Sequence, residues 1–432
     1  MNKLERKRID WLITLAPFIS IMLLAGVLFV FPNESNNIIS KVRFFFGDTV
    51  GIYYLVIGLA VLLVSVYLAF SKYGNVVLGE PNEKPKYPFF VWGSMMFTCG
   101  LAADILFYSF AEWVMYATNP HMEELGSVAE WAGVFPLFHW SFIPWAFYLV
   151  LAVVFGFMLH VRKRNRQRYS EACRPVIGKH ADGVLGRVID LFALFALLAG
   201  TATTFSVATP LLAAIIVKLF GITISRTVVT IIILLVTCAV YTYAVLHGFK
   251  GISFLAKLCI YLFFGLLLIV LLIGGQGKFI IENGFQSFGK MLQHFIELST
   301  FTDPERTSNF PQDWTIYYWA YWMVWCVATP FFIGKISKGR TIKNTILGGY
   351  GWGLAGTFTS FIILGNYGLA QQMKHGIDIS GMIAKSGDYS AVILKIFDTL
   401  PLASLGLLLL VITMIAFYST TFDALTMVVS SY

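Results

Sequence analysis

Long apolar runs separated by short polar segments make up most of the chain. Ten of these runs reach the length that a helix needs to cross the apolar core of a bilayer, about 20 residues. They occupy residues 11–31, 50–70, 88–117, 134–160, 187–219, 226–247, 252–274, 314–336, 343–368 and 398–430. Because the first run is too long for a signal peptide and no small-residue cleavage site follows it, we expect it to remain as an uncleaved helix. The pattern therefore predicts ten membrane-spanning helices.

A shorter and more polar segment, residues 285–298, lies between the seventh and eighth runs. Its apolar residues recur at helical spacing, at Phe285, Phe288, Leu292, Phe295 and Leu298. A segment with this pattern is too polar to cross a membrane, but it can lie along the surface as a helix. We therefore expect an amphipathic helix on the outer surface.

The composition agrees with a membrane protein and excludes other classes. Hydrophobic residues make up 58% of the 432 residues and charged residues only 12%, about half of the roughly 25% found in soluble domains. These values exclude a soluble enzyme, a disordered chain and a disulfide-stapled secreted domain. The sequence has no HExxH, GxSxG or phosphate-binding motif, and its five cysteines form no CxxC pair, so we expect neither an enzyme nor a metal centre. The predicted fold class is an all-α polytopic membrane protein.

Lysine and arginine gather in a few of the short connections. They occur in the N-terminal segment and in the loops 71–87, 161–187 and 335–343, which fall on one side of the membrane if ten spans are counted. The loop 118–133 on the opposite side contains three glutamates and no lysine or arginine. Since cytoplasmic loops carry the excess of positive charge, we expect the N-terminus in the cytoplasm. The net charge of +8 therefore reflects orientation in the membrane and not nucleic-acid binding.

The third span contains an ionisable residue, Asp104, directly after a segment that disfavours a continuous helix. That segment reads Cys-Gly-Leu-Ala-Ala over residues 99–103. Broken helices in carriers expose backbone carbonyls and half-helix ends to a substrate, and ionisable groups inside a membrane usually serve function. Asp104 either contacts a substrate or ion, or it belongs to a buried polar network. Glu112, eight residues later and nearer the outer interface, is interpreted as structural.

Tryptophan and tyrosine are concentrated in the fourth and eighth spans. Aromatic belts collect at the ends of helices, but Trp322 and Trp325 lie deeper than a belt explains. A quaternary ammonium group has no N–H donor, so aromatic faces can replace its lost hydration, each ring contributing about 0.5–2 kcal/mol. The aromatic side chains form either such a cage or ordinary packing.

The tenth span carries three adjacent hydroxyl residues, Ser419, Thr420 and Thr421. Hydroxyls in membrane helices commonly bond back to the carbonyl four residues earlier. Placed against carbonyls of a broken third span, they could instead coordinate a hard cation such as Na⁺. The sequence leaves both alternatives open.

The segment Asp313–Thr341, DWTIYYWAYWMVWCVATPFFIGKISKGRT, resembles the signature of the betaine/carnitine/choline transporter family. In that signature a tryptophan-rich helix precedes an Ile-Ser-basic-Gly-Arg-Thr loop, which corresponds here to Ile336–Thr341. Phe138–Tyr148 resembles the fourth span of the family, and Cys99–Glu112 occupies the position of its glycine stretch. The resemblance extends over nearly the whole chain.

The resemblance implies a fold and a division of the chain. The family has a LeuT-type inverted repeat with two extra N-terminal helices, works by alternating access and commonly forms homotrimers. The corresponding parts here are 1–87 for the N-terminal helices, 88–274 for the first repeat, 275–313 for an outer connection and 314–432 for the second repeat. Because the family has twelve spans, we expect this second repeat to be incomplete and the chain to be a fragment or a truncated form.

The resemblance also implies a substrate and its site. An aromatic box would be formed by Trp140, Trp145, Tyr148 and Trp322, with Trp325 on the access path and Gly100, Ala102 and Asp104 in the glycine stretch. Betaine carriers have glycine at the position of Asp104, whereas choline carriers have aspartate. An ionised aspartate would repel a substrate carboxylate, so we expect choline or a related trimethylammonium cation.

The coupling ion is expected to be Na⁺ or H⁺. Sodium-coupled members carry hydroxyls at the positions of Thr420 and Thr421, facing backbone near Thr98 and Leu101, so these four residues form the candidate Na⁺ site. A protonated Asp104 would suggest H⁺ coupling instead. The alternatives are an exchanger for betaine-like or carnitine-like compounds and a membrane sensor or channel. We expect the protein in the inner (cytoplasmic) membrane.

Overall fold

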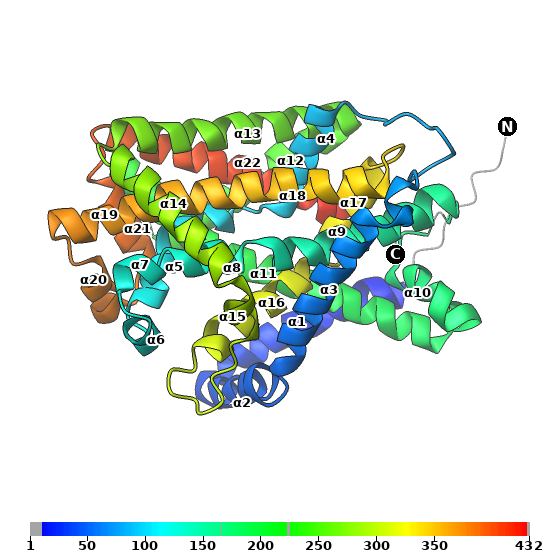
Figure 1. The fold of residues 1–432 in the computed structure, drawn as a ribbon, viewed down its shortest axis with the longest axis horizontal. Helices are drawn as coiled ribbons and strands as arrows, with labels where there is room; N and C mark the ends of the chain where they lie inside the picture. The colour runs from blue at the N-terminus through cyan, green and yellow to red at the C-terminus, as the bar shows by residue number, and fades with distance from the viewer. Residues whose placement is uncertain (1–10, 165, 223–224, 430–432) are drawn as a thin grey trace.

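The computed structural model describes residues 11–164, 166–222 and 225–429 (Figure 1). Over these residues the regular elements are helices, apart from one isolated β-bridge between Val77 and Thr341. In Figure 1 the long helices α13, α18 and α22 run nearly parallel across the molecule. The predicted all-α class is confirmed.

The membrane spans are built from long helices and from shorter helices joined end to end. They are α1 (Trp11–Val30), α3 (Ile52–Phe70), α4 (Phe89–Gly100), α5 (Asp104–Ala117), α8 (Val134–His139), α9 (Phe142–Gly156), α11 (Val184–Phe220), α12 (Arg226–Leu246), α13 (Gly248–Ile273), α16 (Ile316–Trp325), α17 (Thr329–Ile336), α18 (Ile342–Ser360), α19 (Asn366–His375) and α22 (Ala403–Val429). Further helices lie in the connections, namely α2 (Pro32–Phe44), α6 (Pro120–Glu124), α7 (Val128–Trp131), α10 (Tyr169–Ile177), α14 (Gly277–Gln293), α15 (Phe295–Thr300), α20 (Ile379–Ser386) and α21 (Tyr389–Phe397).

By length and composition, seven of the described segments can cross a membrane as single spans. The number rises to nine when each of two bent helix pairs counts as one span. These pairs are α4 with α5, bent by 58°, and Pro311–Trp325 with α17, bent by 53°. The helix α1 is a further apolar segment and coincides with the first predicted run. Each of the ten predicted runs therefore corresponds to helix in the structure, and the chain is a multi-pass membrane protein.

The three basic loops that were predicted to share one side of the membrane do lie together. The loops 71–87 and 335–343 are joined by the β-bridge between Val77 and Thr341. The loops 71–87 and 161–187 are joined by an ion pair between Glu80 and Lys163. These contacts bring the three loops together at one end of the helices.

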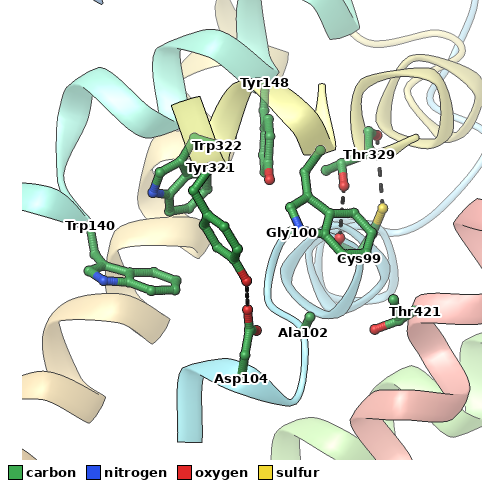
Figure 2. Close-up of a pocket in the computed structure, with 11 residues that line it drawn as sticks. Cys99, Gly100, Ala102, Asp104, Trp140, Tyr148, Tyr321, Trp322, Thr329 and Thr421 are labelled. Atoms are coloured by element: carbon green, nitrogen blue, oxygen red, sulfur yellow. Dashed lines mark hydrogen bonds between the residues drawn. The ribbon is translucent and has the colours of Figure 1, made fainter. Parts of the chain in front are cut away.

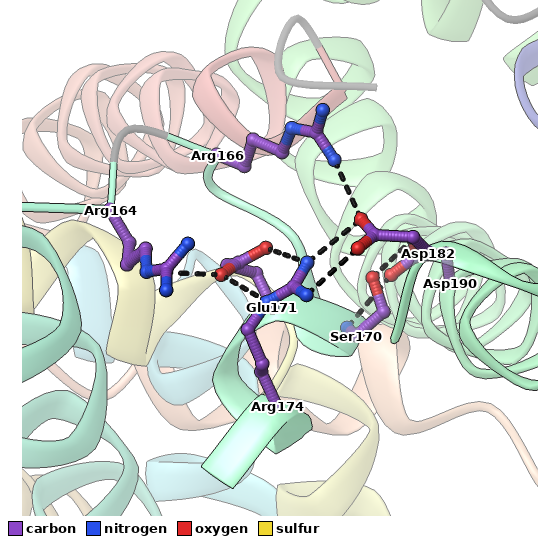
Figure 3. A network of polar contacts seen from close by, with 7 residues as sticks. All are labelled: Arg164, Arg166, Ser170, Glu171, Arg174, Asp182 and Asp190. Atoms are coloured by element: carbon purple, nitrogen blue, oxygen red, sulfur yellow. Dashed lines mark hydrogen bonds and ion pairs between the residues drawn. The ribbon is translucent and has the colours of Figure 1, made fainter. Parts of the chain in front are cut away.

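Charged side chains in the second basic loop hold α10 against the start of α11 (Figure 3). Arg174 donates hydrogen bonds to Glu171 and to Asp182 at 2.7–2.8 Å. Asp190 of α11 accepts from the backbone N–H of Ser170 at 3.0 Å and from its hydroxyl at 2.8 Å. The hydrogen bonds from Arg174 lower the pKa of Asp182 to about 2. These pairs fix the position of α10.

The amphipathic segment differs from its predicted bounds. Instead of one helix over 285–298, α14 begins at Gly277 and a break at His294 separates it from α15. The face that packs on the protein carries Ile280, Gly284, Ser287 and Met291, whereas Phe285 is 80% exposed. Small and polar residues on this buried face permit close helix packing, which a search for apolar spacing alone does not detect.

Candidate functional site

The third span is interrupted where the sequence predicts it. The helix α4 ends at Gly100, Leu101 is extended, and α5 begins at Asp104. A Cβ atom at Gly100 would lie 2.4 Å from the ring of Trp145, so only glycine permits this close approach. Asp104 is thereby placed in the first turn of α5, where the helix dipole favours a negative charge.

A second interruption, between α16 and α17, was not predicted. Its only sequence signal is Pro330, because proline favours the first turn of a new helix. The two interruptions touch: the Thr329 hydroxyl donates to the carbonyl of Cys99 at 3.1 Å, and the Cys99 thiol donates to the carbonyl of Thr329 at 3.8 Å. The two bent spans therefore meet at their break points.

A narrow hollow lies beside this meeting point, with a cavity volume of about 20 Å³ (Figure 2). It is lined by eight residues predicted from the sequence, Gly100, Ala102, Asp104, Trp140, Tyr148, Trp322, Trp325 and Thr421. Three lining residues were missed, Cys99, Tyr321 and Thr329. The structure thus brings parts of spans three, four, eight and ten to one place.

Trp322 is the centre of the aromatic cluster. Its ring centroid lies 4.9 Å from that of Tyr148 and 5.2 Å from that of Trp140, which meets it edge to face. Trp145 lies 5.7 Å from Trp322 but does not line the hollow, because it packs against Gly100 and against Gly353 of α18. Since the rings contact one another, a ligand must part them to reach their faces.

Asp104 is 3% exposed and lines the same hollow. Its Oδ2 accepts hydrogen bonds from the Tyr321 hydroxyl and from the Thr204 hydroxyl of α11, the latter at 3.3 Å. Among the described residues, no lysine, arginine or histidine forms an ion pair with Asp104. The hollow therefore contains a carboxyl group with neutral donors and without a cationic partner from the described part of the chain.

The candidate sodium residues make bonds within their own helices. The hydroxyls of Thr420 and Thr421 both donate to the carbonyl of Phe417, at 2.9 and 3.0 Å. The Thr98 hydroxyl donates to the carbonyl of Ser94 at 3.1 Å. Their helices are neighbours, since α4 and α22 pack together. Thr421 lines the hollow, whereas Thr98, Leu101 and Thr420 do not. Both alternatives raised by the sequence stay open.

Comparison with known proteins decides the family. The model of the betaine/carnitine/choline family transporters (BCCT) matches residues 12–432. The chain belongs to the BCCT family. This assignment confirms the resemblance deduced from the motif over Asp313–Thr341.

Two named carriers are similar to this BCCT chain. The glycine betaine transporter OpuD of Bacillus subtilis is 28% identical over 404 residues, covering 92% of this chain and 77% of the relative. The osmo-independent choline transporter BetT1 of Acinetobacter baylyi is 29% identical over 385 residues, covering 87% of this chain and 72% of the relative. The BCCT chain is therefore similar in sequence to one carrier named for betaine and to one named for choline.

Proposed function

We propose that the chain is a secondary active transporter that imports a quaternary ammonium compound, with choline or a related trimethylammonium cation as the substrate. The observation that carries this proposal is the shared hollow of Asp104, Trp322 and Tyr148. Aromatic faces attract a permanent cation that cannot donate hydrogen bonds, and a desolvated carboxylate adds a charge of opposite sign. The two kinds of group together match a trimethylammonium ion.

The lining favours a substrate without a carboxylate. Among the described residues that line the hollow there is no lysine, arginine or histidine, so the carboxylate of betaine or carnitine would have no cationic partner. It would also be repelled by an ionised Asp104. The neutral donors Tyr321 and Thr204 are already bonded to Asp104. Choline lacks a carboxylate and avoids both penalties.

The contact between the two bent spans supports alternating access as the mechanism. We propose two repeats, over residues 88–274 and 314–432. Each of them begins with one of the bent spans. Movement of one repeat against the other would separate the break points at Cys99 and Thr329 and part the aromatic rings. We propose that Na⁺ at Thr98, Leu101, Thr420 and Thr421, or H⁺, couples this movement to a gradient.

The location and assembly follow from the same proposal. The adjacent basic loops support a cytoplasmic N-terminus in the inner membrane of the cell. A homotrimer is proposed on family membership alone.

Uptake of labelled choline into proteoliposomes tests the proposed function. We expect saturable uptake that depends on an inward Na⁺ or H⁺ gradient. Uptake that ignores both gradients but needs internal substrate would indicate an exchanger instead. Binding of choline without any uptake would indicate a sensor and would contradict the proposal.

A further inference from the structure

The side chain of Glu112 lies behind the hollow and is bonded to one of its rings. Glu112 Oε2 accepts a hydrogen bond from the indole Nε1 of Trp140 at 2.7 Å, and Oε1 accepts from the Tyr116 hydroxyl at 2.5 Å. Glu112 has no exposed surface. Figure 2 shows the indole nitrogen of Trp140 on the side away from the other labelled side chains. The N–H of Trp140 is therefore turned toward Glu112 while the rest of its ring reaches into the hollow.

A chain of buried hydrogen bonds continues from Glu112 to the start of span eight. The Tyr116 hydroxyl lies 2.8 Å from Nδ1 of His139, and Nε2 of His139 lies 3.0 Å from the Thr315 hydroxyl. Because Tyr116 donates to Glu112, its oxygen accepts from the Nδ1–H of His139, and Nε2 then accepts from Thr315. One neutral tautomer of His139 satisfies every bond. Each donor in this series of hydrogen bonds is directed toward the Glu112 carboxylate.

Trp140 differs from the neighbouring indoles in having this bond. The Nε1 atoms of Trp145 and Trp322 have no hydrogen-bond partner among the described residues, so packing alone orients these two rings. Trp140, by contrast, lies at the interruption between α8 and α9. A carboxylate buried in a membrane is costly and usually serves function, and Glu112 is directed at a ring of the cage.

We propose that Glu112 is a positioning residue for the ring of Trp140, an inference that rests on the proposed function. The hydrogen bond fixes the rotation of the indole and so the part of the ring that a substrate meets. The acceptor oxygen at the N–H also polarises the indole and makes its face more attractive to a cation. Glu112 does not touch the substrate and acts through Trp140.

A double-mutant cycle on the full chain, with choline affinity as the readout, tests this role. Glu112→Leu removes the acceptor, and we expect it to weaken choline binding about 3- to 10-fold. Glu112→Gln keeps an acceptor for the indole, so we expect a smaller loss. In a Trp140→Phe background, which lacks the N–H, either change should cost less than about twofold. Equal losses in both backgrounds would show a structural role and overturn the proposal.

Tyr116→Phe is the matched control, because it removes a second donor to Glu112 and leaves the bond to Trp140. We expect its choline affinity to stay within about twofold of the unaltered chain. A loss as large as that of Glu112→Leu would overturn the assignment to Trp140. If the Leu variant fails to fold, the cycle is completed with Glu112→Gln. Absence of choline binding by the unaltered chain would contradict the proposed function, whereas equal losses in a chain that binds choline contradict only the role of Glu112.

Discussion

The Tyr321 hydroxyl donates a hydrogen bond to the carboxylate of Asp104, and this bond joins the two bent spans across the hollow. Asp104 begins α5 and Tyr321 lies on α16. Thr204 of α11 lies within hydrogen-bond distance of both, at 3.3 Å from Asp104 Oδ2 and 3.2 Å from the Tyr321 hydroxyl. The carboxyl group in the hollow is thus held by hydroxyls from two distant parts of the chain.

Replacing Asp104 should change the preference between substrates. Asp104→Gly removes the charge that attracts choline and repels the betaine carboxylate, so the ratio of choline to betaine affinity should fall by about tenfold or more. Competition of each unlabelled compound against labelled choline measures this ratio. If both compounds compete as they do with the unaltered chain, Asp104 does not contact the substrate.

Removing the hydroxyl that supports Asp104 should weaken choline binding without removing a ring. We expect Tyr321→Phe to reduce affinity by about 1.5–3 kcal/mol at most, the range for a hydrogen bond to a charged group. Tyr317→Phe is a matched control on the same span, because its hydroxyl lies 3.4 Å from that of Tyr108 and does not bond to Asp104. Equal losses in the two variants, measured by choline binding, would rule out a specific role for Tyr321.

Loss of the central ring should also reduce affinity. Trp322→Leu removes one cation–π face and should weaken choline binding by about 0.5–2 kcal/mol, whereas Trp322→Phe should recover part of the loss. Equilibrium binding to the purified chain gives both values. Unaltered affinity in the Leu variant would exclude Trp322 from the cage.

The sodium hypothesis is tested at the adjacent hydroxyls of α22. Thr420→Ala should raise the Na⁺ concentration needed for half-maximal choline uptake, because one of the proposed ligands is lost. Ser419→Ala is the control, since that hydroxyl bonds to the carbonyl of Ile415 and is not among the proposed ligands. A sodium response that is the same in both variants would refute the ligand assignment for Thr420.

The sequence predicts those parts of the site that depend on local pattern. The apolar runs predict the spans, and the glycine and alanine residues before Asp104 predict the interruption, because both signals act within a few residues. Trp322 lies among aromatic side chains in the structure, and its contact with a substrate stays a prediction.

The partners of Asp104 depend on tertiary packing and could not be predicted in this way. Tyr321 is 217 residues away in sequence and Thr204 is 100 residues away, and nothing near either residue indicates the contact. The packing of Trp145 depends on tertiary structure in the same way. Its ring lies 5.7 Å from that of Trp322 and packs against Gly353 of α18, and its place in the cage stays a prediction.

The most direct measurement compares choline with 3,3-dimethylbutan-1-ol, its neutral analogue of nearly the same shape, as competitors of labelled choline binding. A site made of aromatic faces and a carboxylate binds the charge and not only the methyl groups, so choline should compete at least about tenfold more strongly than the alcohol. Equal competition by the two compounds would show a hydrophobic pocket without selectivity for a cation and would contradict this account.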